Sequence, residues 1–158
     1  MSFDIDFNYT TAIESINGRI ASLQTIVDAN NSKLVLLQSS VYAGIVTSEI
    51  SALEFVNTTN TTAIANYQDI SNEIARVQAL SQEEKALLYY FYITLGISKT
   101  TYMIKLLFNT HIVNDSRVVA VYNDTTSPAD VKLLVAQMLY DQFPINSKCL
   151  SAHITGFF

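Results

Sequence analysis

Apolar residues in the first part of the chain recur at alternating intervals of three and four residues. This spacing places them on one side of an α-helix and is typical of a coiled-coil seam. Between residues 13 and 44, eight of the ten a and d positions are apolar, and the other two are Asn30 and Gly44. We assign nine residues to the seam: Ile13, Ile16, Ile20, Leu23, Val27, Asn30, Leu34, Leu37 and Val41.

Two architectures fit this seam. Residues 28–32 (Asp-Ala-Asn-Asn-Ser) form a good turn sequence, so two shorter helices could meet there as an antiparallel hairpin within an ordinary bundle. The heptad phase is kept across Asn30, which favours one continuous helix instead. After Gly44 the phase shifts by about two residues, and Val46 and Ile50 carry the apolar stripe onward.

The residues beside the seam are mostly Asn, Gln, Ser and Ala, with Arg19 and Lys33 as the exceptions. Dimeric zippers usually carry Glu and Lys at these flanking positions. With its neutral flanks and its core asparagine, the seam resembles the trimeric stalks of viral fibres and bacterial adhesins. The resemblance implies a homo-oligomer held together through the seam, with a trimer favoured.

The middle of the chain contains one expected break and two further helices. Residues 57–62 (Asn-Thr-Thr-Asn-Thr-Thr) are of types that compete with helical hydrogen bonds, so we expect a loop there. A second helix over residues 63–80 would then fold back on the first. Ser81 and Glu84 form a capping-box pattern that predicts a helix from there to about Phe108, apolar nearly all round and therefore buried.

Residues 110–158 are expected to form a small β-β-α-β element. Two β-branched runs, at residues 111–113 and 117–122, predict a strand–turn–strand unit. Ser127 as N-cap and Pro128 at the first helical position predict a helix that ends at residues 143–144. Residues 149–155 are expected to form a last short strand.

The helix of this element has an apolar stripe that we expect to face the core. Its members are Val131, Leu134, Val135, Met138 and Leu139. The two terminal aromatic residues, Phe157 and Phe158, are expected to dock on a neighbouring element or subunit, since large apolar side chains are costly to leave in water.

These patterns together predict a mainly α protein. Its body is a long helical hairpin or bundle with coiled-coil character, and the small C-terminal element is added at one end. We expect an N-terminal arm over residues 1–8, the helical region over residues 9–109 and the α/β element over residues 110–158.

Charge is sparse along the chain. Charged residues make up 15% of the sequence, compared with about 25% in typical soluble domains. The net charge of −5 argues against a nucleic-acid partner. The longest uncharged apolar run, Ala86 to Ser98, is shorter than the roughly 20 residues of a membrane span, so we expect no membrane partner. The N-terminal residues lack the basic and apolar regions of a signal peptide.

No arrangement of residues in the sequence indicates catalysis or metal binding. Cys149 and His153 provide two ligands where a zinc site needs three or four. On the expected strand they would also lie about 13 Å apart, too far for a thiol and its base. The paired acids Glu83 and Glu84 suit a helix start. We therefore expect a non-enzymatic protein without a cofactor or a metal.

The composition is typical of a subunit that packs on several sides. The chain is 49% hydrophobic, and Asn, Thr, Ser and nine Tyr supply its polar surface, as in many viral and phage structural proteins. We expect a structural subunit of a virion (a phage tail, baseplate, neck or fibre-attachment part) that binds copies of itself and other structural proteins. Its location would be the virion, or the host cytoplasm during assembly. Two alternatives stay open: a membrane-active helical protein, pore-former or holin-like, that uses residues Ala86 to Phe108, and a coiled-coil adaptor module.

Overall fold

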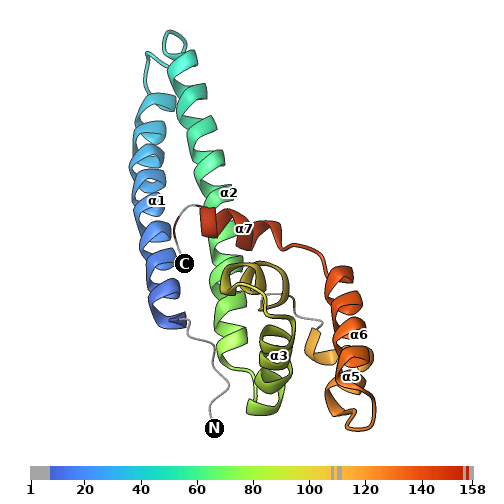
Figure 1. The fold of residues 1–158 in the computed structure, drawn as a ribbon. Helices are drawn as coiled ribbons and strands as arrows, with labels where there is room; N and C mark the ends of the chain where they lie inside the picture. Colours follow the sequence, from blue (N-terminus) through green and yellow to red (C-terminus); the bar gives the residue numbers. More distant parts are fainter. Residues whose placement is uncertain (1–7, 108, 110–111, 155, 157–158) are drawn as a thin grey trace. The chain divides into compact units, whose positions relative to one another are not determined.

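The computed structural model describes the chain except for residues 1–7, 108, 110–111, 155 and 157–158 (Figure 1). The protein is mainly helical, which confirms the predicted class. It divides into two compact units. Residues 10–72 form the first unit, and residues 1–9 together with 73–158 form the second.

The first unit is an antiparallel helical hairpin, in which α1 (Tyr9–Gln38) and α2 (Thr47–Gln78) lie side by side (Figure 1). The end of α2, from Glu73 on, belongs to the second unit. Side-chain hydrogen bonds join the helices: Gln38 Nε2 to Glu54 Oε1 at 3.0 Å, Asn57 Nδ2 to Asn31 Oδ1 at 2.8 Å, and Ser71 Oγ to Asn17 Oδ1 at 3.4 Å. The second and third of these bonds are two heptads apart on each helix. The two helices therefore keep one register over this length.

The chain reverses at residues 39–46 and not at residues 28–32, where α1 is continuous. The reversal coincides with the phase shift at Gly44. Ser39 Oγ donates to the carbonyl of Val35 at 2.7 Å, and Ser40 Oγ donates to that of Leu37 at 2.8 Å. These hydroxyls add a second hydrogen bond to carbonyls in the last turn of α1, which also accept from the N–H groups of Ser39 and Ser40.

The loop predicted over residues 57–62 is wrong, because these residues lie inside α2. The Thr58 hydroxyl donates to the Glu54 carbonyl and the Thr62 hydroxyl to the Thr58 carbonyl, both at 3.0 Å. Asn57 is buried on the side of α2 that bonds to α1. Residue types that often break a helix therefore bond here to their own helix or to its neighbour.

α2 has a seam of its own that matches the seam of α1. Its positions alternate at three and four residues, and all of them are buried or half-buried: Ile50, Leu53, Asn57, Asn60, Ile64, Tyr67 and Ser71. Two asparagines and a serine in this seam make the hairpin interior more polar than an ordinary coiled coil. Asn57 Oδ1 is buried without a hydrogen-bond partner, so this layer is incompletely satisfied.

The second unit is built from short helices. They are α3 (Gln82–Leu95), α4 (Lys99–Tyr102), the π-helical turn η1 (Met103–Leu107), the 3₁₀ turn η2 (Ile112–Asn114), α5 (Ser116–Asn123), α6 (Ala129–Gln142) and α7 (Ser147–Ile154). α3, α5 and α6 pack against one another. Phe91, Tyr102, Ile112 and Val118 are fully buried within this unit.

α3 begins as the sequence predicts. Ser81 is its N-cap, and the reciprocal bonds of a capping box with Glu84 are both present. The helix does not continue to Phe108, because Gly96 adopts a left-handed conformation (φ +60°) and ends it after Leu95. Ser98 then caps α4, so the long apolar run is divided into separate helical pieces.

The predicted β-β-α-β element is wrong: the described part of residues 110–158 contains helices and no strand. Asp115 accepts a hydrogen bond from the Arg117 N–H at 2.9 Å and caps α5, so the β-branched run after it is helical. Asn146 Oδ1 accepts from the Cys149 N–H at 2.9 Å at the start of α7. α6 starts after Pro128, one residue later than expected, and ends at Gln142 as predicted.

We predict that Asn57→Leu stabilises the hairpin. The change removes a buried carbonyl oxygen that has no partner, and such a group costs about 1–3 kcal/mol. The measurement is the free energy of unfolding from urea titrations followed by circular dichroism. Asn31→Ala is the matched control with the opposite sign, because it leaves the buried Asn57 amide without its acceptor. A loss of stability in the leucine variant would contradict the conclusion that the buried Asn57 Oδ1 has no partner.

Candidate interaction surfaces

The predicted oligomer seam lies between the two helices of one chain. Ile16, Leu23, Val27, Asn30 and Leu34 are buried in α1, and Ile13, Ile20 and Leu37 are half-buried. Val41 is in the turn and is 92% exposed, so it does not share the surroundings of the other eight. The seam is occupied by α2, and association of copies stays a prediction. Phe157 and Phe158 lie outside the described residues, so their docking role also stays a prediction.

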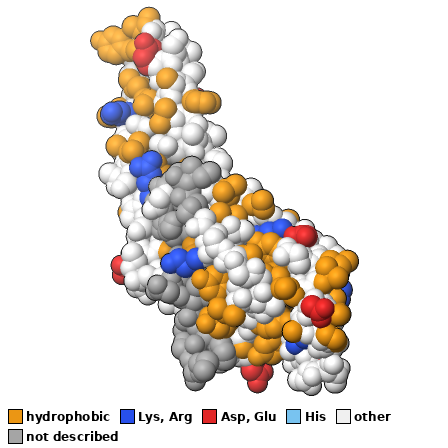
Figure 2. Space-filling model, viewed as in Figure 1, with side chains coloured by type: hydrophobic (Ala, Val, Ile, Leu, Met, Phe, Trp, Pro, Cys, Tyr) orange, Lys and Arg blue, Asp and Glu red, His pale blue; other side chains and the backbone are white. Residues whose placement is uncertain are grey.

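The turn of the hairpin carries an exposed apolar surface, which we call the tip patch. Its members are Leu36, Val41, Tyr42 and Ile45, with exposed fractions of 71%, 92%, 61% and 77%. Figure 2 shows apolar side chains gathered at this end of the hairpin. Residues 34–48 contain no charged side chain. That absence of charge is the signal by which the sequence could have identified the patch.

Several polar groups of the tip are bonded within the tip itself. The hydroxyls of Ser39, Ser40 and Thr47 each donate to a main-chain carbonyl of the same segment. The N–H groups of Ala43, Ile45 and Val46 donate to carbonyls three or four residues earlier. The tip can therefore be buried against an apolar surface without leaving these groups unpaired.

A second exposed apolar surface lies on α6, and we call it the α6 face. It consists of Val131, Leu134, Val135 and Met138, which follow the i, i+3, i+4, i+7 spacing of one helix side and are 36–62% exposed. The spacing of this stripe predicted that it faces the core, which is wrong for these four residues. Of the five predicted members only Leu139 is buried, because α6 packs through Ala136, Leu139 and Tyr140. Figure 2 shows apolar side chains over this helix.

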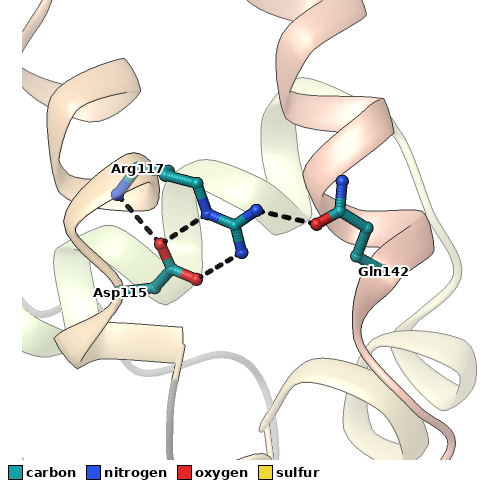
Figure 3. Close-up of polar contacts among 3 residues, drawn as sticks. All are labelled: Asp115, Arg117 and Gln142. Carbon is teal, nitrogen blue, oxygen red and sulfur yellow. Dashed lines mark hydrogen bonds and ion pairs between the residues drawn. The ribbon is translucent and has the colours of Figure 1, made fainter.

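A side-chain cluster fixes the end of α6 beside the start of α5 (Figure 3). The Arg117 guanidinium donates to both carboxylate oxygens of Asp115, with Nε at 3.1 Å and Nη2 at 2.8 Å. Its Nη1 donates to Gln142 Oε1 at 2.7 Å. This hydrogen bonding by Arg117 lowers the pKa of the Asp115 carboxyl below its usual range. The side chains of Asp115, Arg117 and Gln142 thus provide hydrogen-bond partners for one another, which is typical of a structural contact.

Cys149 is a buried thiol. The helical conformation of α7 corrects the strand argument, since Cys149 and His153 are one helical turn apart and not about 13 Å apart. Cys149 Sγ lies 3.6 Å from the Met103 carbonyl oxygen, to which it donates, and burial raises the pKa of the thiol to about 12. A thiol in this environment is protonated at neutral pH and is a poor nucleophile.

The described residues contain few features that could support chemistry. No group of three or more His, Cys, Asp or Glu residues in this part of the chain could hold a metal ion. A groove of about 550 Å³ lies between the first turns of α3 and the second half of α5. Ala86, Leu87 and Val119 form its apolar lining, and Glu83 is the one acid beside them, so the groove lacks a paired acid and base.

Comparison with known proteins gives no match to a family model, to a curated protein or to a solved structure. Among the helices that the structure describes, none combines the length and the apolar character that crossing a bilayer requires.

We predict that Cys149 is protected from thiol reagents in the folded protein. At pH 8 a thiol with a pKa of about 12 is ionised in roughly one molecule in 10⁴, compared with roughly a quarter of free thiols. Labelling with a chromogenic disulfide should therefore be at least about 10³-fold slower in buffer than in urea. Similar rates in the two conditions would contradict the burial of this residue.

We predict that Asp115→Ala destabilises the second unit by about 1 kcal/mol at pH 7, the usual value of an N-cap. Because the folded-state pKa of Asp115 is lowered, its stabilising effect is present above the unfolded-state pKa of about 3.9 and is lost as the pH falls through the folded-state value. The difference in stability between the variant and the wild type, measured by thermal unfolding, should therefore narrow below about pH 4. Asp115→Asn keeps an acceptor and should lack this pH dependence.

Proposed function

We propose that this protein is a non-enzymatic structural subunit of a larger protein assembly, of the kind that makes up a virion: a phage tail, baseplate, neck or fibre-attachment part. The observation that carries the proposal is a pair of apolar surfaces, the tip patch and the α6 face, which the chain leaves uncovered. One lies in each compact unit. A surface of this kind on a soluble protein usually marks an interaction site.

The presence of two such surfaces supports an extended assembly. A subunit with one self-complementary surface closes into a dimer, whereas two different surfaces allow rings or filaments. The sparse charge of the chain supports the same proposal, since charged residues are depleted at the core of interfaces. Ser and Thr hydroxyls that bond to carbonyls of their own helices need no hydrogen-bond donation to a neighbour.

In this proposal the partners are copies of the same chain and other structural proteins, and the site of action is the virion or the host cytoplasm during assembly. The α1 seam holds the hairpin together, so copies associate through the exposed surfaces. The Asp115 cluster and the buried Cys149 are structural features of the subunit.

We predict that the purified protein forms oligomers in solution. The measurement is the molar mass by light scattering over a wide concentration range, compared with the chain mass of 17.6 kDa. A discrete trimer or larger ring supports the proposal and gives the symmetry. A monomer at every concentration would remove self-assembly from it and would leave only assembly with other proteins.

A further inference from the structure

We infer that the tip patch of one copy docks on the α6 face of a second copy. The inference rests on the proposed function and names the two surfaces through which the subunits join. Both surfaces consist of four large apolar side chains, and neither is covered within the chain. The choice of occupant follows from charge and from hydrogen bonding.

An antiparallel two-fold pairing of the α6 face brings like charges together. Asp130 and Asp141 are eleven residues apart on α6, about three helical turns, so they lie along the same edge of the α6 face. In a two-fold antiparallel pair of α6 helices each edge meets its own copy, which places Asp130 beside Asp141 of the second copy.

Pairing of unlike surfaces avoids this repulsion. A contact without two-fold symmetry does not force any edge to meet its own copy. Lys33 is the single basic residue between Arg19 and Arg76, and it lies three positions before Leu36 of the tip patch. It is therefore placed to approach the acidic edge formed by Asp130 and Asp141, and opposite charges at the rim of an interface set its orientation.

Hydrogen bonding points to the same occupant. The hydroxyls of Ser39, Ser40 and Thr47 already donate within the tip, so an apolar surface can cover the patch without unpairing them. The α6 face offers a stripe of Val, Leu and Met side chains on a helix whose main chain is internally bonded. Because each surface is smaller than the 20–30 residues a side of a standard interface, we expect association that depends on concentration.

Two single substitutions test the contact. Val41→Asp places a charge in the tip patch, and Leu134→Asp places one in the α6 face; both side chains are exposed, so the fold should be kept. Each variant alone should be monomeric by light scattering under conditions where the wild type is oligomeric. An equimolar mixture should form a 1:1 dimer of twice 17.6 kDa and nothing larger, because each variant retains the surface that the other has lost.

Phe55→Asp and Ile93→Asp are the matched controls, since these exposed apolar residues lie outside both surfaces and should leave the wild-type mass unchanged. Single variants that stay dimeric would show that like surfaces pair. Single variants with the wild-type mass would show that the copies join through other surfaces. Either result overturns the inference while the proposed function stands. Flotation of the wild type with phosphatidylcholine vesicles, lost in Val41→Asp, would make a lipid surface the occupant of the tip and would also overturn it. A wild type that is monomeric throughout removes self-assembly itself.

Discussion

The packing of α1 against α2 along a single seam determines what the hairpin can expose. Neither α1 nor α2 is expected to be stable as an isolated helix, because the sequence is rich in Asn, Ser and Thr and helical stability in proteins comes mainly from packing of an apolar face. The seam supplies that packing with side chains such as Ile16, Leu23 and Ile64. Once both seams are used, the turn at residues 39–46 has no element of the hairpin left to cover it. Its apolar side chains are therefore exposed as a consequence of the seam.

The polar residues in and beside the seam lower the stability of the hairpin but fix the alignment of α1 with α2. A hairpin of uniform leucine seams could slide by a heptad with little change in buried area. The bond between Asn57 and Asn31, and the bond two heptads further on between Ser71 and Asn17, form only in one alignment. The unpartnered Asn57 Oδ1 is the cost of this arrangement. A fixed register also fixes which residues form the turn, so the composition of the tip patch depends on the polar layer far below it.

Much of the helical part could be predicted from the sequence, because a helix period sustained over five heptads and a capping box are local signals. The wrong loop and the wrong strand share one physical cause: residue preferences can be inferred from the sequence, but hydrogen-bonding partners cannot. Thr58 and Thr62 suggest a loop until their hydroxyls are seen to bond to the preceding turn. The run after Asp115 suggests a strand until the Asp115 cap starts a helix. For α6 the predicted helical periodicity was right, but the predicted orientation of its apolar stripe was wrong. Periodicity identifies an apolar stripe without showing whether it faces the core of its own chain or a surface.

The α6 stripe shows why a charge-poor chain of this kind is suited to assembly. A helix that packs through Ala136, Leu139 and Tyr140 already has its core face, so the second stripe of Val131, Leu134, Val135 and Met138 leaves much of its apolar area exposed. Exposed apolar area is a liability for a protein that stays alone, since it promotes non-specific association. In the proposed assembly the acidic edge of Asp130 and Asp141 would restrict that association, because it disfavours antiparallel pairing of the stripe with itself and leaves it open to a surface that carries a base. Apolar area then provides the affinity and a few charges provide the choice of partner.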